Sequence, residues 1–292
     1  MSEPSRPGLQ DHLTTNLLRV LPQHLLAAGM YRLMRCRTPW VKNLLISRIA
    51  RRYAIDLSEA AEPHADRYPT FNAFFTRALK DDARPIATGA VVSPADGRIS
   101  QIGSILGDEL LQAKGHTFTL EALLAGDRAT AEAFRDGIFA TVYLSPKDYH
   151  RVHIPYAATL RSMVFVPGEL FSVSEATAQL VPGLFARNER VICHFDTAMG
   201  PMAVILVGAI FVGSMQTVWH GEVGGRRGEP TRWVYQGDEC RHFATGDEIG
   251  RFNMGSTVIV LLPRDAAAWN DGAVPGSVVR MGEALGTPLS GR

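Results

Sequence analysis

The spacing of the hydrophobic positions changes near residue 90. In 10–54, and again in roughly 57–82, apolar side chains recur every three or four residues, which predicts helices. Pro22 is expected to break or kink the first of these helices, because proline lacks a backbone N–H. Beyond residue 90, short runs rich in Val, Ile and Phe alternate with Gly, Pro and Asp turns, a pattern typical of β-strands. A helical N-terminal region should therefore precede a β-rich one.

The β-rich region contains apolar runs of strand length and a few short helical stretches. Strands are predicted at 91–92, 99–102, 139–144, 160–166, 190–195, 204–207, 231–235 and 257–262. Helices are predicted at about 120–124, 129–134 and 175–180. No internal repeat or low-complexity linker interrupts the sequence. We predict an α+β fold, with a helical N-terminal region at 1–82 and a mainly β domain at 83–292.

The composition of the 292 residues is that of a globular protein, with 46% hydrophobic and 20% charged side chains. Thirty basic and twenty-nine acidic side chains nearly cancel, so the total charge gives no argument for a nucleic-acid partner. Three widely spaced cysteines, Cys36, Cys193 and Cys240, exclude a disulfide framework and a CxxC metal knuckle. We expect a reducing, cytosol-facing location.

The near-neutral total hides a basic N-terminus. Residues 1–54 carry nine basic and two acidic side chains, a net charge of +7, which leaves −6 for the rest of the chain. With apolar residues between them, these charges fit the anionic surface of a membrane, where each Lys or Arg adds about 1 kcal/mol. The alternative is a pair of helices that covers the core and leaves its arginines in solvent. The sequence favours neither.

One uncharged stretch, 197–219, is long enough to cross a bilayer, which needs about 20 residues. Its glycines, its proline and two apolar runs, 204–207 and 209–212, favour buried β-strands instead. Residues 2–16 are largely charged or polar and lack the apolar core of a signal peptide. We expect the protein, if it contacts a membrane, to lie on its surface.

Two segments carry polar residues suited to chemistry. The first, SPADG at 93–97, has the Pro and Asp-Gly of a surface turn. The second, YHRVH at 149–153, places His150 and His153 three positions apart, and histidines can act as acid and base, bind a metal or hold structure. Because the other histidines and cysteines fall in no ligand pattern, acid–base chemistry is favoured over a metal site.

A third segment, GST at 255–257, opens a predicted strand, where glycine usually marks a turn or bulge. Its spacing differs from both the GxSxG elbow and the GxxxxGK[ST] phosphate loop. Glycine leaves its carbonyl carbon unshielded, so the hydroxyl of the following residue, Ser256, can attack it. Asp96, a histidine and Ser256 would form a relay of orienting group, base and nucleophile if the fold brings them together.

Taken together, these segments resemble the phosphatidylserine decarboxylase family of the bacterial, membrane-associated type. The resemblance rests on six motifs in family order: FNAFFTRALK at 71–80, SPADG at 93–97, YHRVH at 149–153, VPGELFSV at 166–173, LFARNER at 184–190 and GST at 255–257. They extend over most of the chain, and an ordered set is far more specific than any single motif. Met254 departs from the leucine usual in relatives, and the similar volume of the two side chains predicts little effect.

The resemblance implies a proenzyme that cuts its own backbone between Gly255 and Ser256. Asp96 would orient His153, and His153 would take the Ser256 proton so that the serine oxygen attacks the Gly255 carbonyl. The ester then loses the α-proton and releases Gly255 as a carboxyl terminus. The serine residue becomes dehydroalanine, which tautomerises and, on reaction with water, loses ammonia to leave a pyruvoyl group. The products would be a β chain, 1–255, and an α chain, 256–292.

The implied reaction is decarboxylation of phosphatidylserine to phosphatidylethanolamine and CO2. Decarboxylation leaves electrons on the α-carbon, and the pyruvoyl cofactor at position 256, joined to the substrate amine, would accept them. His150 would return a proton to that carbon, because histidine titrates near the working pH. The resemblance implies no metal.

The resemblance also implies partners and a location. An anionic phospholipid membrane holding phosphatidylserine would contact the basic N-terminal region and the apolar side chains around Phe74 and Phe75. The α and β chains would stay together as a heterodimer within a higher homo-oligomer, peripheral on the cytoplasmic side of the cell membrane, without nucleic acid. Two alternatives stay open: a pyruvoyl-dependent decarboxylase of a soluble amino acid, and an unprocessed β-rich binding module.

Overall fold

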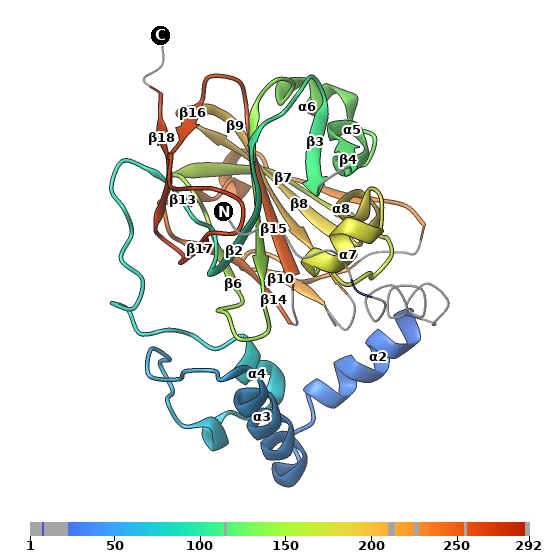
Figure 1. Ribbon diagram of the computed structural model, residues 1–292, viewed down its shortest axis with the longest axis vertical. Coiled ribbons are helices and arrows are strands. Elements are labelled where there is room, and N and C mark those ends of the chain that lie inside the picture. Colours follow the sequence, from blue (N-terminus) through green and yellow to red (C-terminus); the bar gives the residue numbers. More distant parts are fainter. Residues whose placement is uncertain are drawn as a thin grey trace.

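Residues 8, 23–113, 116–209, 214–224, 228–253 and 256–289 are described by the computed structural model. Strands dominate this part of the chain, which confirms the predicted α+β class with a mainly β core. Figure 1 shows α2, α3 and α4 gathered at one end of the molecule, away from the sheets. The bounds of these helices are Gln23–Met34 for α2, Pro39–Tyr53 for α3 and Phe71–Phe75 for α4.

The strands and the remaining helices make up the rest of the described chain. The strands are β1 (Val91–Val92), β2 (Gly97–Ser104), β3 (Glu109–Ala113), β4 (His116–Thr119), β5 (Ile138–Leu144), β6 (Arg151–His153), β7 (Ala158–Val166), β8 (Arg190–Thr197), β9 (Gly200–Val207), β10 (Met215–Thr217), β11 (Gly221–Val223), β12 (Thr231–Val234), β13 (His242–Phe243), β14 (Glu248–Phe252), β15 (Ser256–Leu262), β16 (Ala267–Trp269), β17 (Val278–Val279) and β18 (Ala284–Pro288). The other helices are η1 (Ala65–Arg67), α5 (Leu120–Leu123), α6 (Arg128–Ala133), α7 (Glu175–Leu180), α8 (Leu184–Arg187) and η2 (Gly237–Glu239). The strands and short helices predicted beyond residue 90 are found near their expected positions, except that most of the apolar run 209–212 lies outside the described residues.

The largest sheet contains nine antiparallel strands, in the order β12-β7-β8-β9-β15-β5-β2-β17 with β13 added to β7. β15 lies between β9 and β5, and the side chains of these central strands are mostly buried. Burial on both faces explains why they appear in the sequence as unbroken apolar runs. The stretch 197–219 supplies β9 and β10. Among the described helices, none combines the length and apolar character needed to cross a bilayer.

A four-stranded sheet, in the order β11-β10-β14-β6, packs against the larger one. Two glycines mark the close approach of the sheets. A Cβ at Gly250 of β14 would lie 3.4 Å from the Cδ2 atom of Leu206 in β9. A Cβ at Gly208, directly after β9, would lie 3.7 Å from the Cε atom of Met215 in β10. The chain crosses from the smaller sheet to the larger one between β14 and β15.

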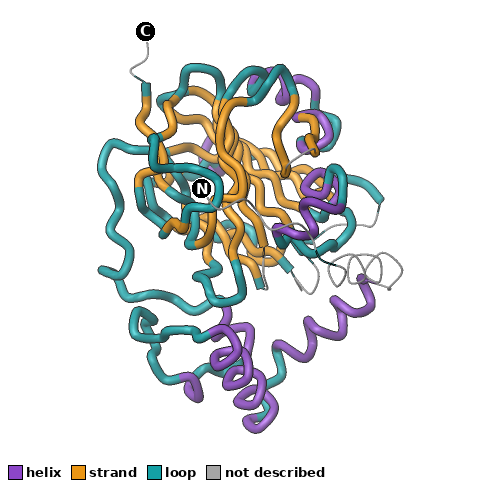
Figure 2. The backbone as a smooth tube through the Cα atoms, in the orientation of Figure 1, coloured by secondary structure: helices purple, strands orange, loops and turns teal. Residues whose placement is uncertain are grey.

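The helix predicted over 57–82 is wrong. This segment forms the short 3₁₀ helix η1 and the short helix α4, and the chain then runs to β1 as a long loop (Figure 2). Pro69 lacks the backbone N–H that a continuous helix needs, so α4 begins only after it, with Thr70 as its N-cap. The membrane contact expected around Phe74 and Phe75 is also wrong at these two residues, because all three phenylalanines of α4 are buried in a small hydrophobic core.

The helices predicted within 10–54 are found as α2 and α3, and positions 10–22 lie outside the described residues. Together with α4 they enclose a small hydrophobic core, built around Ile46 and the phenylalanines of α4. Arg35, just after α2, forms an ion pair with Glu222 of β11. The helical end of the molecule is therefore tied to the smaller sheet.

Candidate active site

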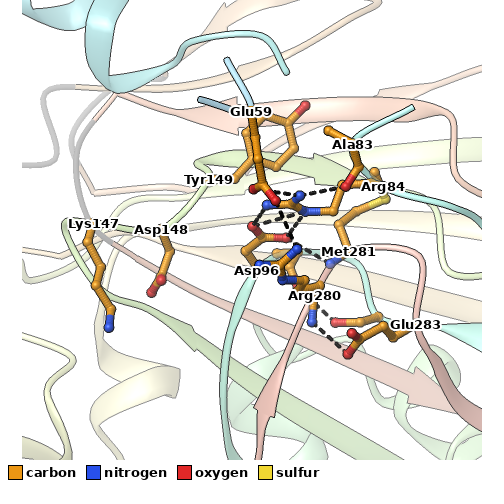
Figure 3. Close-up of polar contacts among 12 residues, drawn as sticks. Glu59, Ala83, Arg84, Asp96, Lys147, Asp148, Tyr149, Arg280, Met281 and Glu283 are labelled. Carbon is orange, nitrogen blue, oxygen red and sulfur yellow. Dashed lines mark hydrogen bonds and ion pairs between the residues drawn. The ribbon is translucent and has the colours of Figure 1, made fainter. Parts of the chain in front are cut away.

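Asp96 lies between β1 and β2, inside a cluster of charged side chains (Figure 3). Its carboxylate accepts hydrogen bonds from Arg84 Nε at 2.9 Å, from Arg84 Nη2 at 2.5 Å and from the Met281 N–H at 2.8 Å. Arg84 also donates to Glu59 at 2.9 Å, and Glu59 accepts from Arg280 at 2.9 Å. Because Asp96 and Arg84 are both buried, this cluster holds the carboxylate in a fixed position.

His153 ends β6, and both of its ring nitrogens form hydrogen bonds. Nδ1 lies 2.7 Å from the Gly246 carbonyl oxygen, which can only accept, so Nδ1 carries the proton. Nε2 therefore accepts the Tyr149 hydroxyl at 3.0 Å. Burial lowers the pKa of His153, and the hydrogen bond to Gly246, the charge of Glu248 and, to a smaller extent, the charge of Asp96 act against this effect. Asp96 thus influences His153 through its charge, while the hydrogen bonds of each residue go to other groups.

His150 follows β5 and is fully buried. Its Nδ1 donates to the Asp148 carbonyl at 2.8 Å, and its ring centroid lies 3.9 Å from that of Phe75 in α4. Within the described part of the chain, its buried Nε2 has no hydrogen-bond partner. Burial lowers the pKa of His150 to about 3, and the charge of Arg77 acts in the same direction. The ring is therefore neutral at physiological pH, and Nε2 offers a free lone pair.

Strand register shows what faces the space between the two sheets. The Phe252 N–H donates to the His150 carbonyl at 3.0 Å, and Phe252 pairs with Met215, so these residues form one row of the smaller sheet. Directly opposed residues of antiparallel strands share a face, so His150 lies on the face of Met215. On the larger sheet, Ser256 begins β15, and the register of β15 with β9 continues to Gly208. Because Met215 faces Gly208, the row of His150 faces the row of Ser256.

Among the described side chains of the predicted site, Asp96 and His153 do not hydrogen-bond to each other. Asp96 and His153 lie together, His150 belongs to the row that faces the larger sheet, and the backbone of Ser256 starts the central strand of that sheet. Gly255 and the side chain of Ser256 lie outside the described residues. Across the described ranges, no group of three or more His, Cys, Asp and Glu residues could hold a metal ion.

Sequence reasoning missed the residues that hold the backbone just before Ser256. The side chain of Asn253, which follows β14, accepts a hydrogen bond from Asn72 Nδ2 at 2.9 Å and donates one to Ser214 Oγ. Asn72 lies in the FNAFFTRALK segment, so the motif included it without showing what it does. Its partner lies 181 positions away, and no local pattern predicts such a contact.

Comparison with known proteins supplies the remaining information. A family model described as "Phosphatidylserine decarboxylase" matches residues 71–287, a range that contains all six motifs. The chain belongs to the phosphatidylserine decarboxylase family. A second family model, described as "PSD", matches residues 13–54. The resemblance drawn from the motifs is therefore confirmed, and the chain is a decarboxylase.

Relatives match this family member along almost its whole length. The phosphatidylserine decarboxylase proenzyme of Azotobacter vinelandii is 52% identical over 284 residues, which cover 95% of this chain and 99% of the relative. The proenzyme of Alkalilimnicola ehrlichii is 56% identical over 254 residues, 86% of this chain and 88% of the relative. That of Pseudomonas aeruginosa is 53% identical over 287 residues, 96% and 99% of the two chains.

Proposed function

We propose that this enzyme, a proenzyme for the decarboxylation of phosphatidylserine, cuts its own backbone between Gly255 and Ser256 and converts Ser256 into a pyruvoyl group. The backbone on both sides of this junction supports the proposal. Asn253 is held by Asn72 and Ser214 before it, and Ser256 is held by β5 after it. The two described residues that flank the junction are therefore each held in place, and they belong to different sheets.

Asp96, His153 and Ser256 carry out the cut in this proposal. His153 Nε2 is the base, and it must first lose the hydrogen bond of the Tyr149 hydroxyl before it can accept the serine proton. Burial raises the pKa of Tyr149 to about 12, so the phenol gives up this contact as a neutral group. Asp96, fixed by Arg84, stabilises the protonated His153 through its charge rather than through a hydrogen bond.

The residues around position 256 fit a small reactive carbonyl. Gly208, which directly follows β9 and lies opposite Ser256 when the register is continued, has no side chain. The buried His150 Nε2 has no hydrogen-bond partner within the described chain. A pyruvoyl group supplies a carbonyl that accepts the electrons left behind by CO2. His150 holds a proton at Nε2 and delivers it to the α-carbon of the substrate. Because its ring is neutral in the uncut chain, it must gain that proton during the reaction.

The helical end of the molecule contacts the membrane in this proposal. Large apolar side chains of α2 and α3 are exposed, namely Leu25, Leu26, Leu33, Trp40 and Leu44. Residues 1–54 also carry a net charge of +7, which attracts anionic lipid. The region 1–82 would thus associate with the cytoplasmic face of the cell membrane as a peripheral element, and 83–292 would carry the catalysis. The β and α chains stay together, within a higher homo-oligomer.

The intact mass of purified protein tests the proposal. The unmodified sequence should give two chains, 1–255 and 256–292, with the second lighter than its sequence mass because Ser256 has become pyruvoyl. Ser256→Ala and His153→Ala should give one unbroken chain. His150→Ala should still be cut but turn over poorly. Active enzyme that consists of one unbroken chain would overturn the proposal.

A further inference from the structure

Glu189 stands between two buried residues whose side chains are hydrogen-bonded to backbone groups. Asn188 Nδ2 donates to the carbonyls of Phe171 and Gly208, each at 2.9 Å, and its Oδ1 accepts the Phe171 N–H at 3.1 Å. Arg190 donates to four backbone carbonyls, at 2.6 to 3.0 Å. The backbone of Glu189 is therefore fixed on both sides.

The carboxylate of Glu189 differs from these neighbours. In the part of the chain that the structure describes, it has no hydrogen bond and no ion pair, although it is partly buried. Burial raises the pKa of Glu189 to about 7. The charged side chains on the adjoining backbone segments are otherwise engaged, since Glu169 pairs with Arg187 and Arg190 bonds carbonyls. A partly buried carboxylate without a cation is costly unless a ligand supplies one.

Strand pairing places Glu189 in the row of Ser256. The Gly208 N–H donates to the Glu189 carbonyl at 2.8 Å. Thr257 of β15 pairs with Val207, so continuing this register by one residue places Gly208 opposite Ser256. Two strand spacings separate Glu189 from Ser256, about 10 Å between Cα atoms. The residue between them has no side chain, and a Cβ at Gly208 would already lie 3.7 Å from Met215 Cε and 3.9 Å from Leu170 Cδ2. Met215 and Leu170 therefore border the space over Gly208, which separates Glu189 from position 256.

The chemistry of phosphatidylserine supplies a cation for this space. Its head group carries an ammonium, which cannot attack a carbonyl until it loses a proton. We propose that Glu189 binds the substrate ammonium and accepts this proton. One N–H bond breaks and one O–H bond forms, and the electron pair stays on nitrogen, ready to attack the carbonyl at position 256. This role rests on the proposed function, and it leaves the α-carbon to His150, which lies on the opposing sheet.

Reductive trapping separates this step from decarboxylation. Purified protein is mixed with phosphatidylserine vesicles and cyanoborohydride, and the mass of chain 256–292 reports the amine that has been captured. Glu189→Gln keeps the size of the side chain but cannot accept the proton. We expect it to be cut normally and to capture amine about 100-fold more slowly at pH 7, with a smaller defect at pH 9, where free amine is more abundant. Glu169→Gln, which alters an exposed paired carboxylate, should behave like the parent.

The possible results test the role of Glu189 separately from the proposed function. Parent-like capture by Glu189→Gln at both pH values would overturn the role of Glu189 and leave the proposed function standing. A parent protein that is never cut, or captures no amine, would overturn the proposed function itself. If Glu189→Gln stays uncut, its rate of amine capture cannot be measured, and the same measurement is made on Glu189→Asp. A cut chain whose capture rate still falls as the pH drops through 7 supports the role, and a rate that does not depend on pH overturns it.

Discussion

His150 is a titratable residue that the fold keeps neutral. Its folded-state pKa of about 3 lies below the ordinary value of 6.5, so the unfolded chain binds the additional proton. The stability that this residue contributes is therefore fully present above pH 6.5 and is lost as the pH falls toward 3. This sign is opposite to that of a histidine stabilised by a carboxylate partner.

Acid should therefore destabilise the uncut protein partly through His150. In the Ser256→Ala background, lowering the pH from 6.5 to 5 should cost about 2 kcal/mol of unfolding free energy from this residue alone. Urea unfolding at both pH values measures the loss. His150→Gln should lose less stability than the parent over this interval, and the exposed His220→Gln should match the parent. An equal loss in all three proteins would contradict the prediction.

Arg84 is the residue that fixes Asp96. Replacing it by methionine leaves a buried carboxylate without its cation, and breaking such a pair costs about 3–5 kcal/mol. We expect Arg84→Met to lower the free energy of unfolding by about that amount and to slow the self-cut. The control is Arg128→Met, whose ion pair with Glu121 is exposed and screened by solvent, so its loss should change stability little. Urea unfolding and electrophoresis of timed samples give the two readouts, and equal values for both variants would refute this view of Arg84.

How much of the site the sequence could reveal depended on the distance along the chain between partners. Asp96, His150 and His153 stood in short motifs, so residue type and spacing identified them as candidates. The bond from Arg84 to Asp96 spans 12 positions, and Asp96 also accepts from Met281, 185 positions away. Such contacts depend on how distant segments pack in the folded chain, so a local sequence pattern cannot predict them.

At the scale of secondary structure, burial explains which elements could be predicted. The central strands of the larger sheet are covered on both faces, so they appear as continuous apolar runs. Strands β10, β11 and β13 have two or three residues each and mix polar with apolar side chains, which gives no periodic signal. In the segment 57–82 the sequence pattern predicted too much helix. Aromatic residues that pack together in and around α4 have the spacing of a longer helix.

Helix α4 packs against the proposed site through Phe75. Phe75 stacks on His150, while the equally buried Phe74 packs against Tyr68. Phe75→Leu should loosen the imidazole and lower kcat several-fold while leaving the self-cut intact. Phe74→Leu loses a similar amount of buried surface and should lower stability without changing kcat. Steady-state kinetics beside urea unfolding would show this difference, and parallel losses of kcat would show that α4 contributes general packing only.

At the scale of the whole molecule, we expect the exposed apolar side chains of α2 and α3 to make their end of the molecule the one that binds lipid. Leu25 in α2 is 72% exposed and Leu106, between β2 and β3, is 77% exposed, so the two leucines form a matched pair. Leu25→Ser should weaken binding to vesicles that contain anionic lipid about tenfold, because a buried leucine is worth about 1.5–3 kcal/mol. Leu106→Ser should leave binding unchanged. Vesicle sedimentation at low and high salt measures both, and equal effects would argue against α2 as the contact.

The position of β15 has a consequence for the protein if it is cut at the proposed junction. The new chain end appears in the interior of a sheet, where β15 is flanked by β9 and β5, while β17 and β18 pair with β2 and β1 of the longer piece. The break therefore opens no exposed sheet edge, and the shorter piece cannot leave without unzipping ladders on two sheets. Scission should be invisible to gel filtration under native conditions and evident only in denaturant. Without the shorter piece, the longer piece would lack β15, so the edges of β9 and β5 would be unpaired and the piece should aggregate.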